Sequence, residues 1–251
     1  MNLDIDTFPT VQSLKAQVVK ETGKDVEFMF EPLAPGVLGS QKPAHRGVIH
    51  HLITINKDYS DLRHSIASFQ MRHILRRQRI KSEQKDLTHQ DSAMEEVLNM
   101  ASKSLARSQA EELAKMAVAG ILIQLVTSVP GVLIHSEMIK EQGELAMQHK
   151  RMMTVNGGNN LTYLNPPNLP IPAKIFKWNK ALLALDNFCF FKLTQDETLV
   201  TPFKMMGLGK LVEPILEAIL APSSMDLDNR ELIDLVAVRL GCTDYFRWVK
   251  V

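Results

Sequence analysis

His73 is the residue of this sequence whose type and position most directly suggest chemistry. The apolar periodicity of residues 60–81 predicts a helix. On its helical wheel His73 falls on the inward face, with Phe69 one turn earlier and Gln70 beside it. A neutral imidazole can bind zinc or exchange a proton. A phenyl ring can do neither, and an amide has no protonation change near neutral pH. His73 is therefore a single candidate ligand without an adjacent base.

Glu111 and Glu112 form an acidic pair in "SQAEELAKMAVAGIL", on a later predicted helix.

Three of the histidines that precede His73 in the chain could be drawn into a shifted metal site with it. His50 and His51 lie in the β-rich run "GVIHHLITIN", and His64 lies near the start of the predicted helix. Adjacent strand residues face opposite sides, so at most one of His50 and His51 faces the core. His64 lies far around the helix from His73. We therefore expect no rebuilt metal site, and we interpret His73 as a core histidine.

A second group of histidines and acids lies in "HSEMIKEQGELAMQH". His135 and His149 could pair there with Glu137 or Glu144. The spacing does not repeat the paired Glu-x-x-His pattern of metal sites in helical bundles. We predict an ordinary surface helix for this segment.

Three arginines follow one stripe of the helix that carries His73. Arg72, Arg76 and Arg79 lie opposite the apolar face, together with Ser65 and Ser68. Such a stripe could bind phosphate groups of a nucleic acid. Without interleaved aromatic residues for base stacking, a solvated helix face with a cationic C-terminal end is the simpler interpretation. We therefore expect no nucleic-acid partner.

The order of the predicted elements resembles that of the small zincin-type metallopeptidases, especially the phage-immunity and radiation-response regulator proteases. Where those proteins carry a phrase like "AHELGHIL", this chain has "IASFQMRHIL" after a predicted strand. The resemblance implies that Phe69 stands at the first ligand position, Gln70 at the base and His73 at the second ligand. It places the third ligand at Glu111 or Glu112. Carried over in this way, His73 and Glu112 could remain as ligands, whereas a zinc peptidase needs three protein ligands and a general base that takes a proton from the bound water. We therefore expect no catalytic residue and no bound metal. The resemblance covers about the first half of the chain and implies a vestigial site, whose hydrolytic mechanism is lost.

We accordingly predict a non-catalytic, peptidase-like protein that binds a protein or peptide partner without a cofactor, with regulation as one role that such binding could serve. The alternative is a metal-dependent hydrolase with zinc around His73 and Glu112. A more distant hypothesis is a nucleic-acid-associated factor that works through the three arginines.

The elements that must position these residues can be read from the same sequence. The segment "PTVQSLKAQVVKETGKD" predicts a helix that ends at Gly23. The segments "VEFMFEPL" and "GVIHHLITIN" predict strands, and "APGVLGSQKPAHR" predicts a loop between them. We expect an α+β, mostly α protein, in which a small N-terminal sheet with a zincin-like helix is followed by a C-terminal helical array.

The rest of the chain predicts helices. Ser92 with Glu95 and Ser108 with Glu111 have capping-box spacing, which indicates helix starts. Residues 117–134 are long enough to span a membrane, but Pro130 favours two buried helices that meet at a bend. The predicted segments are a helix over 130–153, an irregular segment over 154–173, and helices over 173–192, 203–220 and 228–241. The expected domains are a zincin-like unit (1–90), long helices packed on it (91–155) and a helical subdomain (156–251).

Composition narrows the class of protein. The chain has 29 basic and 28 acidic side chains, so its net charge attracts neither nucleic acid nor an anionic membrane. Its two cysteines, Cys189 and Cys242, lack metal-type spacing and predict buried thiols. The N-terminus lacks the features of a secretory signal. We expect a cytoplasmic protein with no membrane partner.

Overall fold

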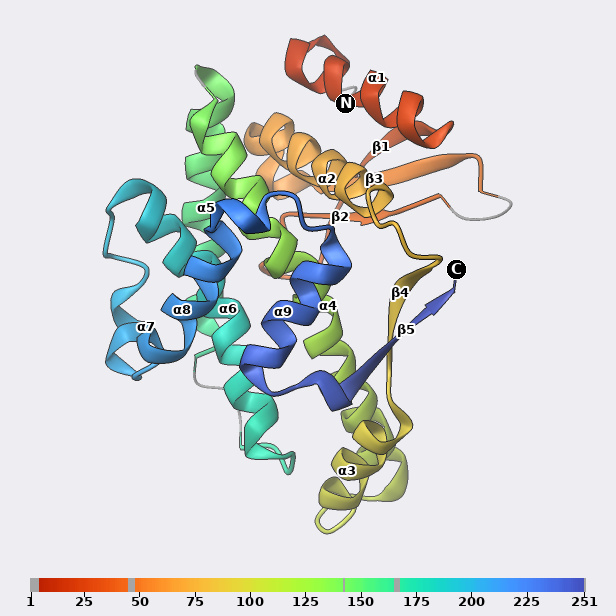
Figure 1. Cartoon of the computed structure of the whole chain (residues 1–251), viewed down its shortest axis with the longest axis vertical. Coiled ribbons are helices and arrows are strands. Elements are labelled where there is room, and N and C mark those ends of the chain that lie inside the picture. Colours follow the sequence, from red (N-terminus) through yellow and green to blue (C-terminus); the bar gives the residue numbers. More distant parts are fainter. Residues whose placement is uncertain (1–4, 45–47, 142, 165–167, 251) are drawn as a thin grey trace. The chain divides into compact units, whose positions relative to one another are not determined.

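A computed structural model describes residues 5–44, 48–141, 143–164 and 168–250 of the chain (Figure 1). Helices account for 67% of the structure and strands for 12%, with small sheets and a helical array. This confirms the expected α+β, mostly α class.

The chain forms two compact units, each assembled from segments that are separated in the sequence. The first unit contains residues up to Arg79 together with Ile134–Asn159. The second contains Ile80–Leu133 together with the residues from Asn160 onward. The consecutive ranges expected from the sequence, 1–90, 91–155 and 156–251, do not coincide with these units, because two long helices contribute residues to both.

The first unit is built on a three-stranded sheet. Its strands are β1 (Asp25–Glu31), β2 (Gly39–Lys42) and β3 (His50–Asn56). The order is β1-β3-β2, with β1 parallel to β3 and β2 antiparallel to it. β1 and β3 were predicted, whereas β2 lies in the segment predicted to be a loop. Its four residues, "GSQK", carry no apolar alternation that could reveal a strand.

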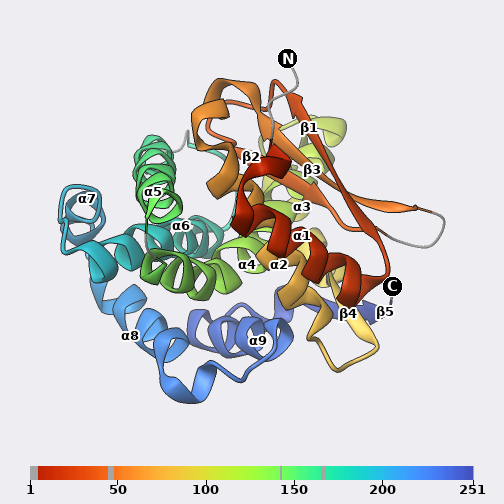
Figure 2. The same ribbon diagram turned by 90° about the horizontal axis from the view of Figure 1, so that it is seen from above.

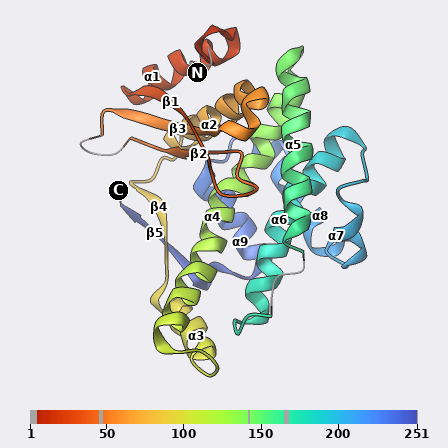
Figure 3. The same cartoon turned by 180° about the vertical axis from the view of Figure 1, so that it is seen from behind.

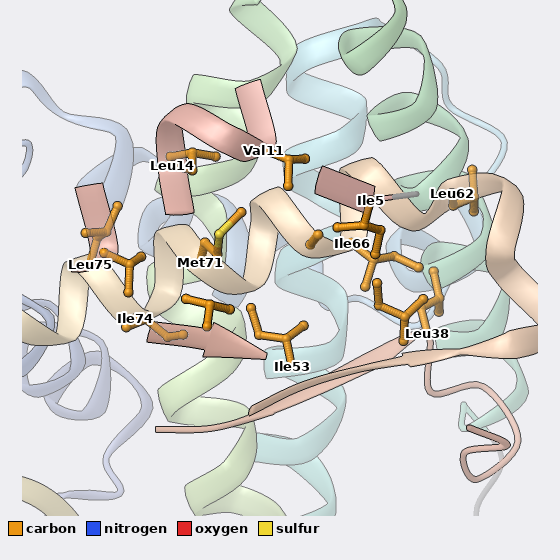
Figure 4. Close-up of a cluster of buried hydrophobic side chains, with 14 of the residues drawn as sticks. Ile5, Val11, Leu14, Leu38, Ile53, Leu62, Ile66, Met71, Ile74 and Leu75 are labelled. Atoms are coloured by element: carbon orange, nitrogen blue, oxygen red, sulfur yellow. The ribbon is translucent and has the colours of Figure 1, made fainter. Parts of the chain in front are cut away.

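Two helices of the first unit pack on this sheet and on each other (Figures 2 and 4). They are α1 (Pro9–Thr22) and α2 (Arg63–Gln78), preceded by short 3-10 turns at Ile5–Thr7 and Lys57–Leu62. Figure 4 shows α2 between α1 and the sheet, with Met71 and Ile53 in the buried cluster. α2 is buried on most of its circumference, so it is the central element of this unit.

Two long helices supply the remaining residues of the first unit. α4 (Arg107–Lys140) contributes its residues from Ile134 onward, and α5 (Glu144–Thr162) contributes its residues up to Asn159. The prediction of two helices meeting at Pro130 is corrected, because α4 continues through this proline. The break falls instead near Gly143, whose φ of 84° favours glycine.

α5 also corrects the predicted irregular segment over 154–173. The helix extends to Thr162 and includes Gly157 and Gly158. Val155 packs against the buried cluster of the first unit, and Asn159 Nδ2 donates to Gly36 O at 3.1 Å. These contacts stabilise a helical end that glycine and asparagine disfavour locally.

The second unit combines helices with a two-stranded sheet. The helices are α3 (Asp91–Ala101), the part of α4 before Ile134, α6 (Ala173–Thr194), α7 (Thr201–Met205), α8 (Gly209–Leu220) and α9 (Asn229–Leu240), with 3-10 turns at Pro222–Ser224 and Thr243–Tyr245. β4 (Gln84–His89) and β5 (Phe246–Lys250) pair antiparallel (Figure 3). The predicted helix over 203–220 is divided at Gly207, which has a φ of 75°.

The C-terminal segment is docked on the second unit. The hydroxyl of Tyr245 donates to the carboxylate of Glu96, which also binds Lys174 Nζ at 2.8 Å. The Lys174 ammonium lies over the ring of Tyr245, 4.8 Å from its centroid. Trp248 Nε1 donates to Asp234 Oδ1 at 2.8 Å.

The described residues contain a capping box at one helix start, but the two serines with capping-box spacing are not helix caps. Asp228 and Glu231 form a capping box at the start of α9, and Gly241 caps its C-terminus. Ser92 is not a cap, because α3 already begins at Asp91. Ser108 likewise lies one residue inside α4.

The two cysteines are buried and free, as predicted. Burial raises the pKa of the Cys189 thiol and raises that of Cys242 to about 12.

Within the described residues, α4 is the one helix long and apolar enough to cross a membrane. Just over half of its apolar window, 56%, is buried inside the structure. A buried core helix has the same length and composition, so this feature does not identify a membrane span.

Candidate functional site

His73 lies on α2 inside the first unit, with only 4% of its surface exposed. The ring of Phe69, one turn earlier, meets the His73 ring edge-on at 4.6 Å between centroids. The opposite neighbour of Phe69 is His135, whose ring stacks on it at 4.7 Å and an interplanar angle of 19°. Phe69 therefore lies between two buried imidazoles.

A third imidazole, that of His149 on α5, completes this group. His149 Nε2 lies 2.9 Å from His135 Nδ1, and its Nδ1 lies 2.9 Å from Ser65 Oγ. Ser65 also contacts the sulfur of Met152 at 3.4 Å. Both ring nitrogens of His149 are thus hydrogen-bonded in a chain that runs from α2 through α5 to α4. We call His73, His135 and His149 the imidazole cluster.

Burial keeps the imidazole cluster neutral. It lowers the pKa of both His73 and His135 to about 3. For His73 the proximity of His135 and Arg76 adds to the effect of burial in reaching this pKa. Burial, with His135 and Arg72, holds the pKa of His149 well below its usual value. Near neutral pH these rings can accept or donate hydrogen bonds, but they carry no charge.

Gln70 points to a different part of the unit, the edge strand β2. Its Nε2 donates to Gly39 O at 3.5 Å. Because Asn56 N donates to Leu38 O at 2.9 Å, the alternation of an antiparallel pair turns the backbone groups of Gly39 and Gln41 away from β3. Gln70 thus lies at the outer edge of the sheet, where its amide can donate and accept hydrogen bonds.

The arginine stripe is not a single solvated face. Arg72 binds the carboxylates of Glu137, at 3.4 Å, and Glu141. Arg76 is buried, with 5% of its surface exposed, whereas Arg79 is exposed. Arg72 therefore ties α2 to the end of α4 in the first unit.

The acidic residues of the predicted vestigial site lie in the second unit. Glu111 Oε1 accepts a hydrogen bond from Arg107 Nε at 3.0 Å, and Glu112 is exposed. His73 belongs to the first unit. The convergence of His73 with Glu112 therefore stays a prediction, whereas Phe69, Gln70 and His73 lie together on α2.

The earlier histidines have separate partners. His50 Nε2 pairs with Glu27 Oε2 on the neighbouring strand. His51 Nδ1 accepts from Ala44 N at 3.0 Å, and its Nε2 lies 3.1 Å from Thr22 Oγ1. The ring of His64 stacks on that of Phe8 at 4.5 Å. As predicted from strand alternation, one of His50 and His51, namely His51, is buried.

Sequence reasoning missed His135 and His149, because their segment was predicted to be a surface helix. Both are buried, with 3% and 0% of their surface exposed. One available signal was their spacing from apolar residues: His149 follows Leu145 by four positions and precedes Met152 by three, so all three share one helix face. Ser65 and Ser68, predicted on the solvated side of α2, are also fully buried.

No three His, Cys, Asp or Glu side chains of the described residues are arranged to hold a metal ion. The ring of Phe69 lies between two of the imidazoles, and two cluster nitrogens are hydrogen-bonded to each other. The present residues therefore do not fit a zinc ion.

No family model, curated protein or solved structure matches this chain. The site is accordingly interpreted from its own geometry.

Proposed function

We propose that this chain is a non-catalytic, zincin-like protein that binds an extended peptide or protein segment along β2. The observation that carries the proposal is the Gln70 amide at the outer edge of this strand, hydrogen-bonded to Gly39 O. The amide occupies the position where the resemblance to zinc peptidases implies a general-base glutamate. It retains hydrogen-bonding capacity at that position without the capacity to take a proton.

The edge of β2 supports binding of an extended chain. Gly39 and Gln41 direct backbone groups away from β3, and β2 pairs only with β3 among the described strands. A sheet edge of this kind can accept a further strand through main-chain hydrogen bonds. Such a partner needs no cofactor and no charge on the imidazole cluster, and we propose that the protein acts in the cytoplasm.

The test begins with peptides selected from a random library against the intact chain. Their affinity is then compared for the wild type, Gln41→Pro and the matched control Gln41→Ala. Proline removes the outward N–H of residue 41 without removing a bond to β3. We expect Gln41→Pro to weaken binding by roughly tenfold, about the value of one lost hydrogen bond, and Gln41→Ala to leave it nearly unchanged.

Two outcomes would contradict the proposal. One is a selected peptide that binds Gln41→Pro as tightly as the wild type. The other is cleavage of selected peptides that depends on added zinc and is lost on His73→Ala. That second result would favour the alternative, a metal-dependent hydrolase around His73 and Glu112.

A further inference from the structure

The part of α4 that belongs to the second unit is apolar on two different sides. One side is buried, with Val118, Ile121 and Leu125 each at most 1% exposed. The other side is open, because 65% of the surface of Met116 and 60% of that of Ile123 are exposed. A surface helix normally carries polar residues towards solvent, so an open apolar side indicates an interaction surface.

The exposed apolar residues of α4 have the spacing of a coiled-coil contact. They are Met116, Ala119, Ile123 and Val126, which follow one another at steps of three, four and three residues. This is the repeat by which two helices pack their side chains into each other. We call these four residues the α4 seam. It extends over about 15 Å of the helix.

The charges near the α4 seam restrict its partner. No charged residue occurs between Lys115 and Glu137 in the sequence. The seam therefore offers nothing that attracts a nucleic acid, an anionic membrane or a charged peptide. The partner that fits is a second helix face, apolar and uncharged over the same length. The α4 seam of a second copy of this chain has both properties.

The order of side-chain sizes in the α4 seam is self-complementary when a second copy runs antiparallel. A two-fold axis near residue 121 would place Met116 against Val126 and Ala119 against Ile123 of the other copy. Each layer then joins a larger to a smaller side chain, as close packing requires. A parallel pair would instead leave a gap between two Ala119 residues. It would also place two Glu112 carboxylates together, because Glu112 continues the same spacing.

We infer that α4 pairs antiparallel with α4 of a second copy of this chain through the α4 seam. A contact confined to about three helical turns is smaller than the roughly 1,200–2,000 Å² of a stable interface. We therefore expect a reversible equilibrium between monomer and dimer. The inference concerns the second unit and is independent of peptide binding at β2, so each can fail while the other stands.

Sedimentation equilibrium of the intact chain over a range of concentrations measures this association. The wild type is compared with Ile123→Glu and with the matched control Val238→Glu. Val238 lies on α9, outside the α4 seam, and 67% of its surface is exposed. We expect Ile123→Glu to raise the dissociation constant of the dimer by at least about tenfold, because a charge enters the seam. Val238→Glu should leave it unchanged.

Disulfide cross-linking tests the direction of the pair. The native Cys189 and Cys242 are buried, so introduced cysteines at exposed positions report on the surface. A disulfide needs Cα atoms within about 7 Å. Ala119→Cys should therefore cross-link to Ile123→Cys when the two variants are mixed, with one of them carrying a mass tag. Neither variant should cross-link to itself.

Four results would overturn the inference. They are a wild type that stays monomeric up to about 1 mM, an Ile123→Glu variant that dimerises as tightly as the wild type, and Ala119→Cys cross-linking to itself in preference to Ile123→Cys. The fourth is binding of the wild type to phosphatidylcholine vesicles that is lost on Ile123→Glu, which would assign the α4 seam to a lipid bilayer.

Discussion

At the scale of single residues, Ser65 and Ser68 differ although both are fully buried on α2. Ser65 Oγ bonds His149 Nδ1, while Ser68 Oγ has no hydrogen-bond partner in the described structure. Leaving a buried donor or acceptor without its partner lowers the free energy of unfolding by about 1–3 kcal/mol, whereas removing an unpaired hydroxyl lowers it much less. The two serines therefore form a matched pair for measuring the hydrogen-bond chain.

We expect Ser65→Ala to lower the free energy of unfolding by about 1–3 kcal/mol, because His149 Nδ1 is left unsatisfied. Ser68→Ala is the control and should change it by less than about 1 kcal/mol. Urea unfolding of both variants, followed by circular dichroism, provides the measurement. Equal decreases in the free energy of unfolding for the two variants would mean that the hydrogen bond between Ser65 and His149 does not stabilise the protein.

At the scale of elements, the close approach of β2 to α2 depends on Gly39. A Cβ atom at this position would collide with Cγ2 of Ile66 and lie 3.1 Å from Thr54 O. The glycine thus allows the strand to pack directly on the helix that carries Gln70. Gly158 in α5 differs, because a Cβ there would meet nothing within 4 Å.

Gly39→Ala should therefore destabilise the protein by about 1–3 kcal/mol, the usual cost of overpacking. Gly158→Ala should stabilise it by roughly 0.5–1 kcal/mol, because alanine is the better helix former and meets no obstacle. Thermal unfolding of the two variants measures both effects. A stabilising Gly39→Ala would show that β2 can move away from α2 at little cost.

At the scale of the whole molecule, the buried imidazole cluster links folding to pH. The pKa values of His73 and His135 fall from 6.5 to about 3 on burial, and that of His149 falls well below 6.5. The unfolded chain therefore takes up protons first as the pH drops. The contribution of neutral histidines to stability is complete above about pH 6.5 and is lost progressively towards about pH 3.

We expect the free energy of unfolding to fall below pH 6.5 by roughly 1 kcal/mol per pH unit for each of the three histidines. His73→Leu should reduce this slope by about 1 kcal/mol per pH unit, the contribution of one histidine. It should cost little stability at pH 7.5, because His73 Nε2 has no hydrogen-bond partner in the described structure. Denaturant unfolding from pH 7.5 to 5 gives the slopes. Identical slopes for the wild type and His73→Leu would exclude His73 as one of the linked groups.

Several elements were determined by the sequence itself, because their signals are local. Asp228, Glu231 and Gly241 define both ends of α9 within a few residues of each end. Alternating apolar residues predicted β1 and β3, and the inward position of His73 followed from helical periodicity.

The tertiary structure decided what depends on residues distant in the sequence. Phe69 and His73 could be placed on one helix, but their neighbours His135 and His149 could not be predicted, because the burial of these two depends on packing against α2. The same holds for β4 and β5, which pair across most of the second unit's sequence. Short-range patterns record backbone preference and the direction of a side chain, while burial and partners depend on which segments pack together.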